Sequence, residues 1–189
     1  SMIVDVKEKG SYQIIGQSQD DAVGEAFDKV AKLLNLPYPG GPYIEKIALN
    51  GDPETYDFPR PMIHSDNLDM SLSGLKTSVL YTVQKIDNLD EKVKSNIAAS
   101  FQKAVSDLLI AKTTKAIKTT NRKDLIIAGG VAANKFIRNE FKNIEEDLNI
   151  KVYYPDLKYC GDNAAMIAFV GSKMSSKNEG YSTSKVRAR

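Results

Sequence analysis

The chain has 189 residues, 42% hydrophobic and 26% charged, which suits a water-soluble globular protein of one large domain or two small lobes. Its formal net charge of +2 gives no sign of a generally basic nucleic-acid binder, although it does not exclude a local basic surface. The single cysteine, Cys160, rules out an intrachain disulfide, and no apolar run approaches the ~18 residues of a membrane-spanning helix, so we expect a cytoplasmic protein that does not enter a membrane.

In the first half of the chain, hydrophobic periodicity predicts a β-hairpin and then helices. Short β-like runs at residues 3–6 and 12–15 flank a Lys-Gly-Ser sequence that is typical of a hairpin turn. Asp20 or Asp21 is expected near the N-cap of the first helix. Helical spacing covers residues 20–34, 43–49 and 73–83, and the intervening residues 54–70 predict a long ordered loop or an edge strand.

The second half predicts alternating helices and strands, which is typical of an α/β lobe. A long amphipathic helix, a buried strand, a helix, a second strand and an apolar helix are expected at residues 90–116, 125–128, 132–148, 151–154 and 163–170. The continuous apolar pattern of the last element predicts a mostly buried helix. We expect the folded lobe to cover residues 3–172 and a polar tail to cover residues 173–189.

The sequence Ala-Gly-Gly-Val-Ala-Ala-Asn at residues 128–134 follows an apolar run and precedes a helical pattern. A strand, a diglycine turn and a helix start are the parts of a phosphate or nucleotide cradle, because glycines admit a ligand close to the backbone and free N–H groups favour anions. Many α/β units use glycines in this place for packing alone. The motif therefore leaves a packing turn and a nucleotide cradle as alternatives.

Two further segments offer groups that could face such a ligand. Asp21, Glu25 and Asp28 are spaced to share one helix face, where they form either a solvated acidic surface or acceptors for ribose hydroxyls or metal-bound water. Gly24 in the same helix costs about 1 kcal/mol relative to alanine, which suggests that another group approaches there. The Pro-Gly-Gly-Pro sequence at residues 39–42 either joins two helices or presents backbone to a nucleoside.

The sequence contains no complete transition-metal site. Asp162 precedes an apolar helix, where it could be an N-cap or a metal ligand. A metal site would need further donors, usually histidines, and the only histidine, His64, lies in a polar loop where a solvated side chain is the ordinary outcome. No His-x-x-x-His pair, cysteine pair or Ser/His/Asp arrangement occurs in the sequence.

Six motifs lie along the chain at residues 16–31, 36–42, 58–62, 73–77, 128–134 and 160–168. Together, and in this order, they resemble the TsaD/Gcp/Kae-type tRNA N6-adenosine threonylcarbamoyltransferase family, formerly called O-sialoglycoprotein endopeptidases. The resemblance covers nearly all of residues 3–172.

The resemblance implies an actin-like (ASKHA) superfold, in which this chain would be the second lobe, an α/β unit with a mixed sheet and flanking helices. It also implies a transferase that moves a threonylcarbamoyl group from threonylcarbamoyl-AMP to N6 of the adenosine beside the anticodon of a tRNA. Members of the family use one iron or zinc ion and bind a nucleotide of the ATP or AMP type. Their partner subunits are of the TsaB/TsaE or KEOPS type.

The resemblance also implies a set of site residues. It places nucleotide contacts at Asp28, Gly41 and Asn134, a weaker ribose contact at Glu45, and a metal-ligating carboxylate at Asp162. Carboxylates can accept hydrogen bonds from ribose hydroxyls, and the Gly129–Gly130 turn offers close approach to backbone. A metal ion would polarise the carbamoyl carbonyl or bind the phosphate as a Lewis acid. No catalytic side chain is assigned.

The resemblance extends to only part of such a protein. The first lobe, with its His-x-x-x-His motif and Ser-Gly-Gly loop, has no counterpart here, and Ser1-Met2 looks like the remnant of a removed tag. We therefore expect a truncation or the product of a split gene. Such a fragment is expected to be inactive alone, to bind adenine nucleotides weakly and to hold no metal firmly.

Three other functions compete with this interpretation. A metallo-glycoprotease is disfavoured because a second metal ligand and a recognisable general base are missing. A non-catalytic scaffold paralogue would have no need of Asp28, Gly41, Asn134 and Asp162. A sugar kinase of the same superfold would carry different motifs.

Overall fold

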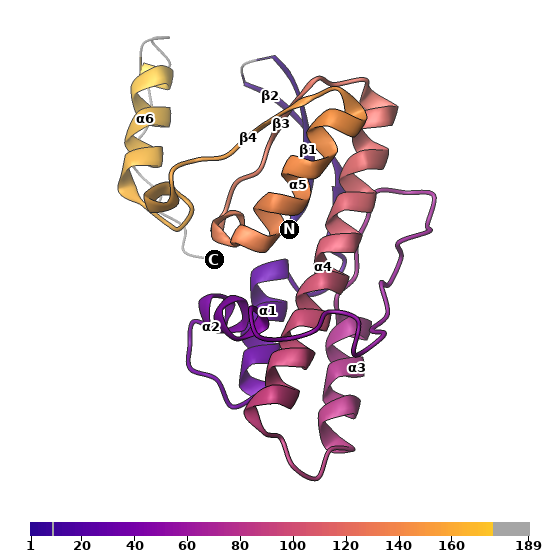
Figure 1. Cartoon of the computed structure of the whole chain (residues 1–189). Helices are drawn as coiled ribbons and strands as arrows, with labels where there is room; N and C mark the ends of the chain where they lie inside the picture. The colour runs from indigo at the N-terminus through magenta and orange to yellow at the C-terminus, as the bar shows by residue number, and fades with distance from the viewer. Residues whose placement is uncertain (9, 176–189) are drawn as a thin grey trace.

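The computed structural model describes residues 1–8 and 10–175, and the predicted tail lies outside this part of the chain from residue 176 onward. Figure 1 shows its helices, strands and short 3-10 turns in an α/β arrangement. In chain order they are β1 Met2–Glu8, β2 Ser11–Gln17, α1 Val23–Leu33, α2 Gly40–Ala48, α3 Ser73–Gln84, α4 Glu91–Thr120, β3 Asp124–Ile126, η1 Gly130–Ala133, α5 Lys135–Leu148, β4 Lys151–Tyr153, η2 Leu157–Tyr159 and α6 Ala164–Ser175.

The strands form two small sheets, and the expectation of one mixed sheet is wrong for the described residues. β1 and β2 pair antiparallel as the predicted hairpin, while β3 and β4 pair parallel. Side chains, and no backbone ladder, connect the two sheets: Arg122, just before β3, donates through Nε to Asp5 of β1 at 2.6 Å and through Nη2 at 3.2 Å. The expectation of a buried strand is also wrong, because Asp124 and Ile126 of β3 are exposed, Ile126 to 71%, and only Leu125 between them is half-buried.

The core lies among the helices, and α4 is its longest element. Asp90 caps the start of α4 by accepting a hydrogen bond from the Val93 N–H, and Asn121 ends the helix in a left-handed conformation. The Phe27 ring of α1 packs edge-on against Phe101 of α4, with 5.1 Å between ring centroids. α3 lies beside α4 in Figure 1, and no helix of the described residues combines the length and apolar character needed to cross a membrane.

The start of α1 differs from the prediction that Asp20 or Asp21 lies at the N-cap. The N-cap is Ala22, which has no side-chain acceptor to offer. Asp20 instead accepts hydrogen bonds from the Leu72 N–H and the Ser71 hydroxyl, at the start of α3. The carboxylate thus joins two distant segments of the chain, which a local capping rule does not anticipate.

This arrangement makes Asp20 a source of acid sensitivity. Burial opposes ionisation of the carboxyl, but the hydrogen bonds from Leu72, Ser71 and Ser73 outweigh it and lower the pKa of Asp20 from 3.8 to about 2. The stabilisation is complete above pH ~4 and is lost as pH falls towards 2. Because Asp20 is largely exposed, solvent screens these interactions. We therefore expect its ionised carboxylate to contribute about 1 kcal/mol to the free energy of unfolding.

Urea denaturation between pH 2 and 6 checks this expectation. The Asp20→Asn variant should lose stability at pH 6 and show a flatter pH profile between pH 4 and 2. Asp87→Asn, at an exposed loop position, is the control and should keep the wild-type profile. An Asp20→Asn profile parallel to that of the wild type would contradict the linkage.

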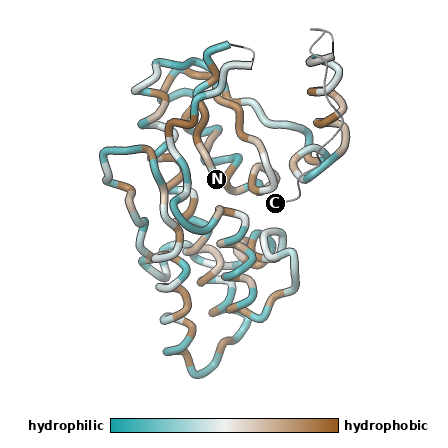
Figure 2. Tube along the Cα trace, turned by 180° about the vertical axis from the view of Figure 1, so that it is seen from behind, coloured by the Kyte–Doolittle hydropathy of each residue, from teal (hydrophilic) through white to brown (hydrophobic). Residues whose placement is uncertain are grey.

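The expectation that residues 163–170 form a mostly buried helix is wrong. α6 forms, but Met166, Ile167, Phe169 and Val170 are 46–68% exposed. The segment between β4 and α6 leads away from the other elements, and α6 stands apart in Figure 1 while carrying apolar positions in Figure 2. The apolar pattern therefore identified the helix correctly, but its residues meet no core surface within the described chain.

Candidate functional site

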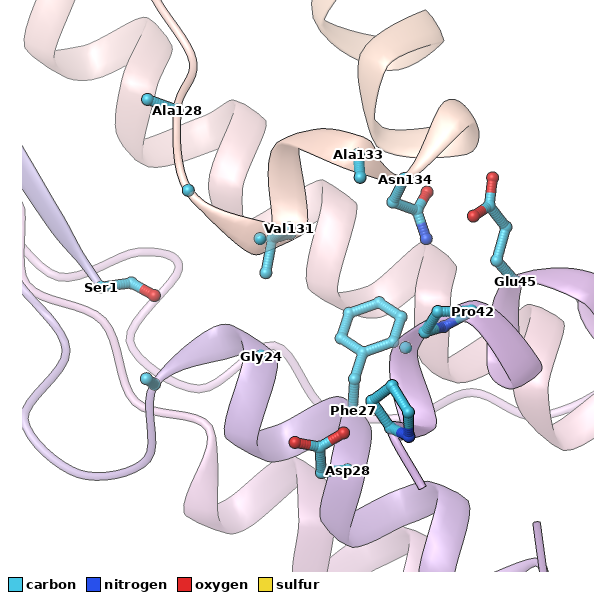
Figure 3. A pocket seen from close by; sticks show the side chains of 15 residues that line it. Ser1, Gly24, Phe27, Asp28, Pro42, Glu45, Ala128, Val131, Ala133 and Asn134 are labelled. Carbon is cyan, nitrogen blue, oxygen red and sulfur yellow. The ribbon is translucent and has the colours of Figure 1, made fainter. Parts of the chain in front are cut away.

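A cleft of about 440 Å³ lies between α1, the start of α2 and the loop that follows β3 (Figure 3). The six residues expected to contact a nucleotide come from these three segments, and all of them line the cleft. They are Asp28, Gly41, Glu45, Gly129, Gly130 and Asn134. Folding thus brings together motifs that are well separated in the sequence.

The Pro-Gly-Gly-Pro turn forms one wall because α2 begins in direct contact with α1. A Cβ atom on Gly40 would lie 2.5 Å from the Ala31 Cβ and 2.8 Å from the Asp28 Cα, so only glycine fits between the helices. Asp28 Oδ1 accepts a hydrogen bond from the Gly40 N–H at 2.7 Å. The next residue, Gly41, faces the cleft, and its Cβ position has no atom within 4 Å.

The opposite wall is the diglycine loop, residues 127–134, which joins β3 to α5. Gly129 has a φ of +89°, which L side chains rarely adopt, and a Cβ on Gly130 would meet nothing within 4 Å. Within the described chain, the N–H groups of Gly130 and Val131 donate to no protein acceptor. This wall can therefore offer backbone donors to a ligand.

Gly24 of α1 faces this loop across the cleft, but the close approach predicted from a mid-helix glycine is not observed. A Cβ on Gly24 would lie 3.8 Å from Val131 Cγ2, which is an ordinary contact. An alanine would fit there, so the approach is not a tight one.

Asn134 and Glu45 are both engaged with the start of α5. Asn134 Oδ1 accepts from the Ile137 N–H at 3.0 Å, and Asn134 Nδ2 donates to Gln102 Oε1 at 2.8 Å. Glu45 accepts from the Lys135 N–H at 2.8 Å. The predicted helix over residues 132–148 is accordingly divided into η1 and α5, because Asn134 is extended and acts as the N-cap. Both side chains hold the wall of the cleft in place.

Of the three acidic residues expected on one helix face, only Asp28 reaches the cleft. Lys29 forms ion pairs with Asp21 at 2.5 Å and with Glu25 at 2.7 Å, and Lys76 pairs with Asp21 at 2.9 Å. Hydrogen bonds from Lys29 and Lys76 lower the pKa of Asp21. Asp21 and Glu25 therefore belong to a surface ion-pair cluster outside the cleft.

Asp162 lies outside the cleft lining, in an exposed position before α6. Across residues 1–8 and 10–175, no group of three or more His, Cys, Asp or Glu side chains is arranged to hold a metal ion. His64 is exposed in the loop before α3. The described residues therefore do not make up an iron or zinc site, and Asp162 could supply one ligand at most.

The floor of the cleft was not predicted from the sequence. Phe27 is 2% exposed and contacts Phe101, yet it also lines the cleft beside Asp28. Figure 3 shows its ring between the two walls. Its position on the apolar face of α1 is the same signal that any core residue gives, so the sequence offers no means of distinguishing floor from core.

The family model and the relatives that match this chain all carry the same family name. The family model for TsaD, tRNA N6-adenosine threonylcarbamoyltransferase, matches residues 1–169. A protein of that name from Thermosipho africanus is 52% identical over 172 residues, which are 91% of this chain and 52% of the relative. Another from Buchnera aphidicola is 51% identical over 86% of this chain and 48% of its own length, and one from Neisseria meningitidis is 43% identical over 100% of this chain and 58% of its own.

The chain thus spans about half the length of the curated relatives it matches. The match nevertheless extends through all three segments of the cleft and through Asp162. The chain belongs to the tRNA N6-adenosine threonylcarbamoyltransferase (TsaD) family.

Proposed function

We propose that this chain is the nucleotide-binding half of a tRNA-modifying transferase and that the cleft holds the adenylate part of threonylcarbamoyl-AMP. The observation that carries the proposal is the convergence of three separate motifs on one cleft. In the whole protein, the chain would form the second lobe of an actin-like (ASKHA) fold. The relatives' names specify tRNA and N6 of adenosine as the acceptor.

The cleft residues suit an adenylate chemically. Phe27 and the adjoining prolines offer apolar surface to the base, and the second carboxylate oxygen of Asp28 can accept from a ribose hydroxyl. The N–H groups of Gly130 and Val131, which have no acceptor within the described chain, can donate hydrogen bonds to phosphate oxygens. The ribose would accordingly lie towards Asp28 and the phosphate towards the diglycine loop.

The proposed reaction is an acyl-type transfer. The N6 amine of adenosine forms a bond to the carbamoyl carbon, the bond from that carbon to the phosphate oxygen breaks, and AMP leaves while the amine loses its proton. The part this chain plays is to bind and orient the adenylate, which raises the effective concentration of the reacting group. No side chain of the cleft is assigned as the base.

We further propose that Asp162 contributes one oxygen ligand to an iron or zinc ion whose other ligands come from outside this chain. Three or more protein ligands are the norm for such ions, so the chain alone should not retain one firmly. In the whole protein, TsaB/TsaE-type or KEOPS-type subunits would be the partners, and the cytoplasm would be the place of action.

Calorimetry with AMP tests the proposal on the 189-residue chain. We expect weak but saturable binding, because a ligand touched from one side loses contacts while its ordering cost is unchanged. Gly41→Leu should weaken binding at least tenfold, since the new side chain would occupy the open space of the cleft.

Gly171→Leu is the matched control for this measurement. Gly171 is also a helical glycine with open space at its Cβ position, but it lies on α6, outside the cleft. Its replacement should leave AMP affinity unchanged. Absence of saturable binding to the wild type, or an equal loss in both variants, would overturn the proposed function.

A further inference from the structure

One arginine on α5 contacts both loops to which the proposed function assigns roles. Arg138 donates through Nε to the Ala132 carbonyl in the diglycine loop. Through Nη2 it donates to the Pro155 carbonyl at 3.0 Å and to Cys160 Sγ at 3.3 Å. Pro155 and Cys160 belong to the segment that leads to Asp162. Resting on the proposed function, we propose that Arg138 is a positioning residue that couples the nucleotide loop to the loop carrying Asp162.

The two ends of this connection lie next to the groups that matter. Ala132 is 1% exposed, and its neighbours Val131 and Ala133 line the cleft. Cys160 is 4% exposed and is separated from Asp162 by a single glycine. A displacement of either loop therefore changes the hydrogen bonds that the same guanidinium makes to the other.

The guanidinium itself is held in a defined orientation. Its Cζ lies 5.0 Å from the centroid of the Tyr154 ring. The Tyr154 hydroxyl donates to the backbone carbonyl of Arg138 at 2.9 Å, which holds that ring against α5. A planar fork with several fixed donors can serve acceptors in two directions at once, whereas a lysine ammonium is a single point at the end of a flexible stem. The arrangement thus needs arginine and not merely a positive charge.

No other hydrogen bond within the described chain joins the diglycine loop directly to the segment of residues 155–163. The turns of each loop are closed by their own bonds, from the Ala132 N–H to the Gly129 carbonyl and from the Tyr159 N–H to the Asp156 carbonyl. Removing the arginine should therefore loosen both loops together and abolish the hydrogen-bonded connection between them.

Hydrogen exchange of the 189-residue chain is the test, with and without AMP. In Arg138→Met, the amides of residues 132, 134, 159 and 160, which are bonded within their own turns, should exchange about tenfold faster than in the wild type. Arg138→Lys should give a smaller change in both loops. Arg122→Met, which removes an arginine bonded to Asp5, is the control and should leave both loops unchanged.

The addition of AMP distinguishes coupling from simple loss of packing. In the wild type, AMP should slow exchange in the diglycine loop and also at residues 159–160. In Arg138→Met, it should slow the diglycine loop alone. The single cysteine gives a second readout, because AMP should slow thiol labelling of Cys160 in the wild type and not in Arg138→Met.

The outcomes are separable. Faster exchange in only one loop of Arg138→Met, or an AMP effect at residues 159–160 that survives the substitution, would overturn the coupling. If AMP does not bind the wild type, the proposed function fails, and the ligand-free comparison still decides whether Arg138 connects the loops. Should Arg138→Met fail to fold by circular dichroism, Arg138→Lys and Tyr154→Leu, which removes the ring that faces the guanidinium, carry the same comparison. Unchanged exchange in both of them would refute the proposal.

Discussion

Replacing Gly40 by alanine is expected to lower the free energy of unfolding by about 3 kcal/mol, whereas the same change at Gly41 should leave stability equal or slightly higher. A Cβ on Gly40 would lie 2.5 Å from the Ala31 Cβ and 2.9 Å from the Phe27 carbonyl oxygen, so α2 would have to move away from α1. At Gly41 the added methyl group meets nothing within 4 Å, and alanine restricts the unfolded chain more than glycine does.

Urea denaturation of the two variants, followed by far-UV circular dichroism, measures the difference. Because both substitutions are glycine to alanine in the first turn of one helix, helix propensity changes alike in both. Only the contact with α1 differs between them. Equal destabilisation at the two positions would show that α2 does not pack on α1 at this distance.

The second large effect is expected at Asp162 once the chain is joined to the rest of a whole protein. We expect a fusion with the remaining half of the Thermosipho africanus relative to bind about one iron or zinc ion and to transfer threonylcarbamoyl to tRNA. In that fusion, Asp162→Ala should reduce bound metal to well under one ion per chain and lower transfer by at least a hundredfold, since each ligand of such a site is needed.

Asp156→Ala is the matched control, because Asp156 belongs to the same segment and its side chain makes no capping hydrogen bond to η2. Metal content by elemental analysis and transfer to tRNA are measured on the same samples. If Asp162→Ala keeps both metal and transfer, Asp162 has no role as a ligand. Loss of both in Asp156→Ala would instead point to a general disturbance of the segment.

Features that depend on neighbouring residues could be predicted from the sequence, whereas features that depend on contacts between distant residues could not. The hairpin, the long helix and the glycine turns follow from local periodicity and turn chemistry, so α4 and the β1–β2 pair were predicted closely. The N-cap of α1 was not, because Asp20 bonds to Leu72, which is distant in sequence. Burial of a helix depends likewise on what surrounds it, as α6 demonstrates.

The candidate site was predictable in composition but not in its internal contacts. The glycine motifs and the family resemblance together pointed to six residues, and the structure places all six around one cleft. The sequence could not indicate that Asn134 and Glu45 satisfy N–H groups of α5, because those bonds join separate elements. For the same reason Arg138 gave no signal, since its acceptors are mostly backbone carbonyls whose place only the fold determines.

The solvent-facing apolar side chains of α6 have a practical consequence for the behaviour of this polypeptide in concentrated salt. Met166, Ile167 and Phe169 present their surface to water, and concentrated salt screens the charge repulsion that opposes contact between molecules. Ammonium sulfate strengthens the tendency of such surface to leave water. The polypeptide should therefore precipitate at lower ammonium sulfate concentrations than its charged-residue content alone would indicate, and substituting serine at these three positions should raise that threshold.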